Sequence, residues 1–389
     1  GGGGGWGGGL TPARPRRFRP DAHSLTHHGC TLWWRPLGKP TDITYNDPSS
    51  TISPGRRGGQ KDVAPFCAQM SSADGVEEEE GDLVAKPFRG LYGILLTTYN
   101  DKDEVEYDDL ASQADFVAAT AQGIVWPVLA SEFYLMSDEE RMAGYPHVVA
   151  GSRRRVPFVA GVSATTTRGA AKLAEAAATA GADAVIAMAP YMKKATGEQL
   201  VKHFQAIAAA GLPIFIQNAA FLTGACTLTS TDLQMLADRI PQVQYLKEEA
   251  PVLPQTISNI LKKVPGVFKG VFGGGGGRFL IDELNRGGAG NMPACEWADV
   301  FGHAFDLYER GDKAGARRVH VAALAGVNFE ASYGMIGARE VLKCRGVLRS
   351  TASRYSTQAD FDADARAELD ATLEFLQPYL RWPDHKLRP

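Results

Sequence analysis

Residues 244–250 read Gln244-Tyr245-Leu246-Lys247-Glu248-Glu249-Ala250, and the fold prediction starts from this heptapeptide. A short apolar run precedes it and a Pro-rich turn follows it, which is typical of a buried strand that ends in a loop. Side chains alternate between the two faces of a strand, so Tyr245, Lys247 and Glu249 share one face and Glu248 lies on the other. The shared face indicates either an ordinary ion pair at a strand end or a reactive amine. An amine that loses its water shell is more often neutral and can then attack a carbonyl.

Outward from this heptapeptide, strand-like apolar runs alternate with helical stretches. The runs cover residues 90–99, 123–130, 156–161, 184–189, 213–218, 243–247, 267–272 and 288–292. The helical stretches cover residues 109–122, 137–150, 166–180, 197–210, 229–239, 252–263, 278–286 and 296–311. Ser137 and Glu140 form a capping-box pattern, and Gly181 is a helix stop. Eight strand–helix pairs in about 220 residues predict an α/β fold, a (β/α)8 TIM barrel.

An open doubly wound sheet is the competing architecture. It would more often place a Gly-rich phosphate turn after the first strand, where this chain has Thr-Thr-Tyr-Asn at residues 97–100. A glycine run does occur at residues 273–277, but it lacks the flanking residues of a phosphate-binding motif. We interpret that run as a flexible or close-packed loop.

Two segments flank the predicted barrel, which spans residues 88–311. Residues 1–87 form a low-complexity N-terminal extension with glycine, arginine and glutamate runs, predicted to be disordered or an artefact of start-site choice. An organelle transit peptide is the alternative for this extension, because its first 40 residues are Arg-rich and acid-poor. Residues 312–389 are predicted to form C-terminal helices over 313–325, 333–345 and 360–380. This helical appendix would pack on the barrel or on a neighbouring subunit.

The composition argues against several function classes. The formal net charge is -3 and 44% of the residues are hydrophobic, so neither a nucleic-acid nor a membrane partner is predicted. No run of 18 or more apolar residues occurs. The five cysteines lie far apart and form neither a disulfide framework nor a metal-like pair, which fits a reducing compartment and a cytoplasmic location.

Active sites of (β/α)8 barrels lie at the carboxyl ends of the strands. The candidates at these positions are Thr97, Ser131, Glu132, Tyr191, Gln217, Lys247, Glu249 and Asn291. No His or Cys set recurs there with metal-ligand spacing, so we predict no metal and no cofactor.

Structural roles compete with substrate binding for five of these candidates. Tyr191 would pack over the barrel mouth, Gln217 would satisfy buried backbone groups, and Glu132 would accept a hydrogen bond where a helix begins. Thr97 and Ser131 would act as capping residues. The sequence leaves these alternatives open.

Lys247 and Glu249 together suit Schiff-base chemistry on a ketone. Lys247 would condense with the ketone to form a protonated imine, which makes a proton on the adjacent carbon removable. Glu249 is the candidate proton-transfer group, because it shares the strand face. The resulting enamine would either eliminate a leaving group or undergo carbon–carbon cleavage.

From residue 88 to about residue 382 the chain resembles the dihydrodipicolinate synthase / N-acetylneuraminate lyase family. The resemblance rests on Gly93-Ile94-Leu95-Leu96-Thr97-Thr98, Ala189-Pro190-Tyr191, Leu212-Pro213-Ile214-Phe215-Ile216-Gln217-Asn218 and Tyr245-Leu246-Lys247-Glu248-Glu249. It implies a (β/α)8 barrel with C-terminal helices, no cofactor, a Schiff base on Lys247 and a homo-oligomer, either a tetramer or a dimer.

The departures from the family pattern point to one branch. After the second strand, where the family has G-T-T-G-E, this chain reads Leu129-Ala130-Ser131-Glu132, so the threonine pair is absent and only the Glu matches. Gln217 stands where the family has its acid/base tyrosine, and Leu222 stands where it has its carboxylate-binding arginine. An amide cannot relay a proton as a phenol does, and leucine cannot pair with a carboxylate.

The dehydratases of 2-keto-3-deoxy sugar acids, particularly of L-2-keto-3-deoxyarabonate, are similar to this chain with those changes included. These dehydratases have a glutamine at the position of Gln217 and an acid at the position of Glu249. They are also similar in sequence over residues 130–141 and 337–347. The resemblance implies dehydration of a 2-keto-3-deoxy sugar acid to a semialdehyde. The alternatives are a pyruvate-dependent aldolase, dihydrodipicolinate synthase itself (4-hydroxy-tetrahydrodipicolinate synthase) and a non-catalytic ligand-binding relative.

Overall fold

The computed structural model describes residues 1–3, 87–219, 227–355 and 360–382. Contacts divide the chain into two units, Gly1–Glu79 and Glu80–Pro389, and the fold described below belongs to the second. The predicted disorder of residues 1–87 falls almost entirely outside the described residues and stays a prediction.

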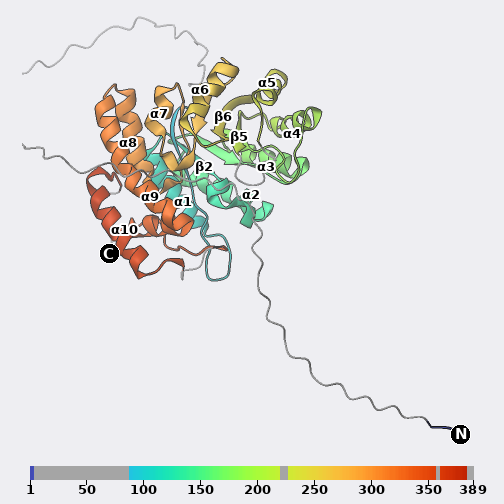
Figure 1. Cartoon of the computed structure of the whole chain (residues 1–389), viewed down its shortest axis with the longest axis horizontal. Helices are drawn as coiled ribbons and strands as arrows, with labels where there is room; N and C mark the ends of the chain where they lie inside the picture. The colour runs from blue at the N-terminus through green and yellow to red at the C-terminus, as the bar shows by residue number, and fades with distance from the viewer. Residues whose placement is uncertain (4–86, 220–226, 356–359, 383–389) are drawn as a thin grey trace, which may run out of the picture. The chain divides into compact units, whose positions relative to one another are not determined.

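Eight parallel strands close into one barrel in chain order, so the predicted (β/α)8 fold is confirmed (Figure 1). The strands are β1 (Gly90–Ile94), β2 (Gly123–Trp126), β3 (Phe158–Gly161), β4 (Ala184–Ala187), β5 (Ile214–Ala219), β6 (Val243–Glu249), β7 (Gly270–Gly273) and β8 (Gly290–Asn291). β1 pairs with both β2 and β8, which closes the ring.

Each strand is followed by a helix on the outside of the ring. These helices are α1 (Tyr107–Thr120), α2 (Asp138–Ser152), α3 (Thr167–Ala180), α4 (Glu198–Ala208), α5 (Ser230–Arg239), α6 (Pro254–Lys263), α7 (Leu280–Asn285) and α8 (Ala298–Glu309). The predicted capping box is present: Ser137 Oγ accepts from the amide of Glu140, and the Glu140 carboxylate accepts from the amide of Ser137. Gly181 ends α3 in the left-handed conformation with φ +88°, as its position predicted.

Four strands end earlier than their apolar runs predicted, and β1 and β2 are shortened most. β1 ends at Ile94 because Gln113 of α1 takes over the backbone groups of Leu96: its Oε1 accepts from the amide at 2.8 Å and its Nε2 donates to the carbonyl at 2.9 Å. β2 ends at Trp126 because Pro127 has no amide hydrogen to donate to the ladder. Thr97 and Ser131 therefore lie in loops above the barrel instead of on its strands.

The core has two layers. A large outer cluster fills the space between strands and helices, and a smaller inner cluster fills the barrel itself. Phe215, Tyr245 and Phe272 belong to the inner cluster, and the rings of Phe215 and Tyr245 stack with centroids 4.5 Å apart. These rings plug the lower part of the barrel, so polar side chains further along the same strand faces point to its carboxyl end.

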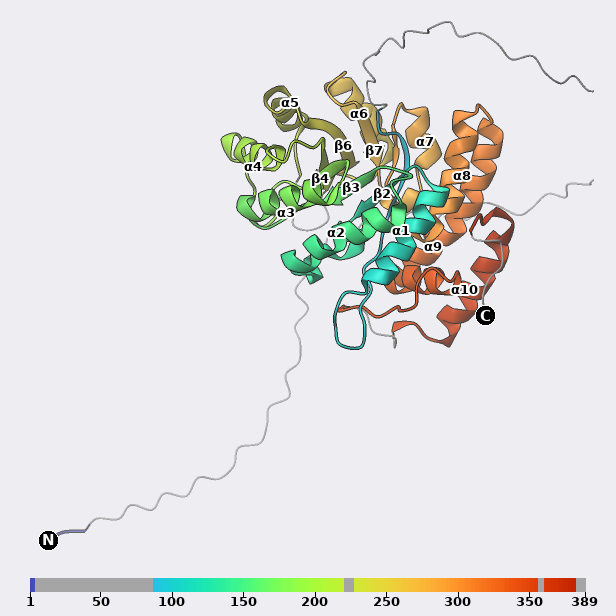
Figure 2. The same ribbon diagram turned by 180° about the vertical axis from the view of Figure 1, so that it is seen from behind.

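The C-terminal appendix consists of α9 (Lys313–Cys344) and α10 (Ala363–Leu376), which lie against the barrel near α1 and α8 (Figure 2). Two helices were predicted over 313–325 and 333–345, and α9 indeed consists of two helical segments that meet at a kink at Gly334, where φ is +61°. The first segment runs further along the chain than predicted. Within the described ranges, every helix is too short or too polar to cross a bilayer.

Candidate active site

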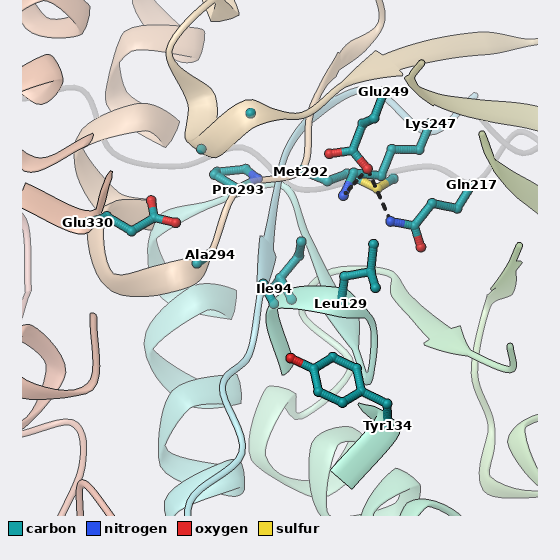
Figure 3. Close-up of a pocket in the computed structure, with 13 residues that line it drawn as sticks. Ile94, Leu129, Tyr134, Gln217, Lys247, Glu249, Met292, Pro293, Ala294 and Glu330 are labelled. Carbon is teal, nitrogen blue, oxygen red and sulfur yellow. Dashed lines mark hydrogen bonds and ion pairs between the residues drawn. The ribbon is translucent and has the colours of Figure 1, made fainter. Parts of the chain in front are cut away.

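Lys247, Glu249 and Gln217 meet at the carboxyl end of the barrel (Figure 3). The Nζ atom of Lys247 lies 3.1 Å from Oε2 of Glu249, and the Nε2 of Gln217 donates to the same oxygen at 3.1 Å. The side chains of Lys247 and Glu249 are only 4% and 6% exposed. All three line a cavity of about 360 Å³ that opens at the barrel mouth.

The pairing of β5 with β6 explains why these side chains converge. Gln217 lies opposite Lys247 in the register, and Ala219 lies opposite Glu249, so β6 continues two residues beyond its predicted end. Lys247 and Glu249 share the inner face with Tyr245, as strand alternation predicted.

Glu248 projects from the opposite face of β6, also as predicted. Its carboxylate accepts from Asn218 Nδ2 at 2.9 Å and from the amide of Ala250 at 2.8 Å. Burial raises the pKa of Glu248 to about 7, although both hydrogen bonds act in the opposite direction. Glu248 therefore secures the end of β6 while Lys247 and Glu249 face the cavity.

The glycine run at residues 273–277 packs directly against the acidic side chains, in agreement with the close-packed interpretation. A Cβ atom on Gly274 would lie 1.9 Å from Oε1 of Glu249, and one on Gly273 would lie 2.1 Å from the carboxylate of Glu283. Two of these glycines, Gly275 and Gly276, line the cavity. Any larger residue at Gly274 would push Glu249 away from its position beside Lys247.

Thr97, Ser131 and Glu132 were predicted to bind substrate, but none of them lines the cavity. Thr97 Oγ1 donates to the carbonyl of Ser131 at 2.8 Å, and Ser131 Oγ donates to the carbonyl of Leu95 at 2.6 Å. These bonds hold the two loops together, one above β1 and one above β2. Their neighbours Leu129 and Ala130 do line the cavity, so the network sets the position of that wall.

Glu132 connects this network to the C-terminal appendix. Its carboxylate forms a buried ion pair with Arg339 of α9, whose Nε also donates to the carbonyl of Thr97 at 3.1 Å. Arg339 is fully buried. The pair fastens α9 to the loops at the barrel mouth, and breaking such a pair by removing one partner is strongly destabilising.

Asn291 and Tyr191 also lie outside the cavity lining. Asn291 Nδ2 donates to Glu283 Oε2 at 2.7 Å and to the carbonyl of Gly274 at 2.9 Å. Asn291 therefore holds the backbone of the glycine run in place. Burial raises the pKa of Glu283 to about 7. Tyr191 is half-buried and packs edge-on against Phe133, as the alternative of packing over the barrel mouth predicted.

Three polar or flexible lining residues were missed by the sequence reasoning: Tyr134, Met292 and Glu330. Tyr134 is 52% exposed and precedes α2, so its place in the segment that resembles the dehydratases could have marked it. Glu330 comes from the middle of α9, and nothing in its local sequence distinguishes it from a solvated helix residue.

Comparison with known proteins identifies the family. Residues 87–375 match the model of the dihydrodipicolinate synthetase family. The 4-hydroxy-tetrahydrodipicolinate synthase of Bacillus subtilis is 30% identical over 183 residues, which covers 46% of this chain and 62% of that protein. The L-2-keto-3-deoxyarabonate dehydratase of Azospirillum brasilense is 27% identical over 304 residues, which covers 76% of this chain and 96% of that protein.

Solved structures show the same fold. A prophage protein of the dihydrodipicolinic acid synthase family from E. coli K12, solved in complex with pyruvate, superposes with a TM-score of 0.68 at 22% identity over 75% of this chain and 99% of its own. The dihydrodipicolinate synthase of Rhodopseudomonas palustris superposes with a TM-score of 0.65 at 25% identity over 74% and 97%. With a family match that spans nearly all of the described barrel and appendix, the chain belongs to the dihydrodipicolinate synthetase family, a family of lyases.

Proposed function

We propose that the chain is a class I Schiff-base lyase that dehydrates a 2-keto-3-deoxy sugar acid. One observation carries the proposal: a buried lysine amine lies 3.1 Å from a buried carboxylate inside a cavity at the carboxyl end of the barrel. This geometry lets a proton pass from Lys247 to Glu249 before the amine attacks a ketone.

The reaction balances with these two groups alone. Lys247 Nζ attacks C2 of the keto acid, and loss of water gives a protonated imine. Glu249 removes a proton from C3, which neutralises the imine nitrogen as an enamine. The enamine then expels the C4 hydroxyl, and Glu249 returns its proton to that leaving group, which departs as water. In the resulting unsaturated imine of a pentonate, Glu249 moves a proton from C5 to C3, and the C5 enol becomes an aldehyde as its hydroxyl proton passes to C4. One water then hydrolyses the imine, which releases the semialdehyde and frees Lys247.

Gln217 supports dehydration over the synthase reaction. Its Nε2 donates to Glu249, while its Oε1 has no hydrogen-bond partner among the described residues. An amide in this position orients Glu249 but transfers no proton itself, so proton transfer falls to Glu249.

A second candidate function is 4-hydroxy-tetrahydrodipicolinate synthesis. Its support is that the relatives from Bacillus subtilis, Enterococcus faecalis and Methanocaldococcus jannaschii all carry that name. The imine on Lys247 would then form with pyruvate, and its enamine would condense with an aldehyde. Aldol cleavage of a longer keto acid is the reverse of that condensation, and the same imine would serve it.

Borohydride trapping with a panel of 2-keto acids tests the proposal. The adduct should form on Lys247 and be lost in Lys247→Ala, while Lys262→Ala, an exposed lysine of α6, should trap normally. Product analysis then separates the candidates. An intact-carbon semialdehyde supports dehydration, pyruvate release supports the aldolase, and condensation of pyruvate with aspartate semialdehyde supports the synthase. Unmodified Lys247 with every keto acid, together with ligand affinity that Lys247→Ala leaves unchanged, would identify a non-catalytic binding protein.

We further propose a homo-oligomer, a tetramer or a dimer, in a reducing cytoplasmic setting. The family resemblance supports the assembly, and the two described cysteines, Cys295 and Cys344, are both free and buried. Light scattering of the purified full chain tests the assembly, and a monomer at all concentrations would contradict it.

A further inference from the structure

A second acidic group, Glu330, lies across the cavity from the reactive pair. It comes from α9 and lines the cavity at the side opposite Lys247, with Met292, Pro293 and Ala294 between them (Figure 3). One carboxylate oxygen of Glu330 faces the glycine run, because a Cβ atom on Gly276 would lie 3.0 Å from its Oε2. The C-terminal appendix therefore completes the wall of a cavity that the barrel strands begin.

A second buried carboxyl group, that of Glu296, influences Glu330. Glu296, in the short 3-10 helix Cys295–Trp297, is 1% exposed, and its Oε2 has no hydrogen-bond partner among the described residues. Burial and the neighbouring Glu330 carboxylate raise the pKa of Glu296 well above its usual range. Burial therefore favours the protonated, neutral form of Glu296. Burial raises the pKa of Glu330 as well, although the charge of Arg278 acts in the opposite direction.

The charge of the cavity wall restricts what can bind there. Among the described lining residues, Lys247 is the only cation, and Glu249 and Glu330 are the acidic groups. Arg278 is exposed and does not line the cavity. Once Lys247 has formed an imine, a second carboxylate at the far end of a substrate would meet Glu330 with no lining cation to pair with it, and like charges in a buried site repel strongly.

A hydroxyl group fits the same position. It can donate a hydrogen bond to the free lone pairs of Glu330, and a hydrogen bond to a charged acceptor is among the stronger ones in proteins. We propose that Glu330 recognises a hydroxyl group at the substrate end distal to the ketone, so that the cavity takes a 2-keto acid with a neutral, hydroxylated tail and rejects one that ends in a second carboxylate. This inference rests on the proposed imine at Lys247 and assigns the substrate class of that site.

The assignment is tested in the full-length protein with 2-keto acids that differ at the end distal to the ketone. Borohydride trapping rates are measured for pyruvate, which has no tail, and for 2-ketoglutarate, which ends in a carboxylate; kcat/KM is measured for a 2-keto-3-deoxypentonate. In Glu330→Gln, the ratio of 2-ketoglutarate to pyruvate trapping should rise by about 10-fold or more, because the repulsion is removed. In Glu330→Ala, kcat/KM for the sugar acid should fall by about 10- to 100-fold, chiefly through KM, while pyruvate trapping is unchanged.

Glu368→Gln is the matched control. It removes one carboxylate from the exposed face of α10, away from the cavity lining, so the trapping ratio should stay within about twofold of the unmodified protein. The proposal is overturned if Glu330→Gln leaves the trapping ratio unchanged, or if it slows pyruvate trapping as much as it changes trapping of 2-ketoglutarate. These ratios do not depend on dehydration. Failure to dehydrate any sugar acid would reject the proposed function, and an unchanged ratio would reject only the role of Glu330.

Discussion

Gly274→Ala should disable the enzyme without touching a reactive group. The new Cβ would lie 1.9 Å from Glu249 Oε1 and 2.5 Å from its Cδ, whereas real contacts of this kind are essentially never shorter than 3.0 Å. The carboxylate must therefore move by at least about 1 Å, away from a lysine that now lies 3.1 Å away. Overpacking of this kind costs about 1–3 kcal/mol of folding free energy. Losing a positioned proton-transfer group lowers turnover by about 10²- to 10⁴-fold.

The assay combines urea unfolding, borohydride trapping and turnover in three backgrounds. With Glu249 present, Gly274→Ala should lose stability and turnover but still trap a keto acid on Lys247. Glu249→Ala removes the atoms that would obstruct the new Cβ, so adding Gly274→Ala to that variant should cost little further stability. The coupling free energy between the two substitutions should therefore be about 1–3 kcal/mol. In Glu249→Gln the obstruction remains without the charge, so the stability cost should persist. Wild-type turnover in Gly274→Ala, or the same stability cost in the Glu249→Ala background, would refute the reasoning.

Three further predictions concern stability. Burial raises the pKa of Glu283 from 4.5 to about 7, so the folded protein keeps a proton that the unfolded chain releases, and about 3 kcal/mol of stability is lost as the pH rises from about 4.5 to 7. Glu283→Gln should flatten that slope in urea titrations between pH 4.5 and 8, and an unchanged slope would contradict the assignment. Arg345→Met should destabilise the protein by about 3–5 kcal/mol in denaturant unfolding, because it leaves the buried carboxylate of Asp299, 2.5 Å from Arg345 Nη2, without its ion-pair partner. Unchanged stability would show that Asp299 finds another partner. Ser137→Ala should cost about 1 kcal/mol by thermal unfolding through loss of the Glu140 capping box, and no change would mean that α2 does not depend on its cap.

The repetition of strand and helix along the chain was sufficient to predict the barrel and the faces of β6. A strand alternates its side chains with a period of two, so the sequence alone put Lys247 and Glu249 together and Glu248 apart. Active sites of this fold lie at the carboxyl ends of strands, so Gln217 could be predicted to lie near Lys247 before the register was known. These are local properties, and local properties can be predicted from neighbouring residues.

What lay beyond the strands depended on the tertiary structure. Thr97, Ser131 and Asn291 come at strand ends in the sequence, yet each donates a hydrogen bond within the protein. The bonds of Thr97 and Ser131 join the segments that follow β1 and β2, and Asn291 of β8 donates to Glu283 of α7. Glu330 reaches the cavity from a helix more than 80 residues after Lys247, and only the packing of α9 on the barrel brings the two to one cavity. Contacts between segments so distant in the chain depend on how the helices pack on the barrel. That packing cannot be predicted from the hydrophobic periodicity of any single segment.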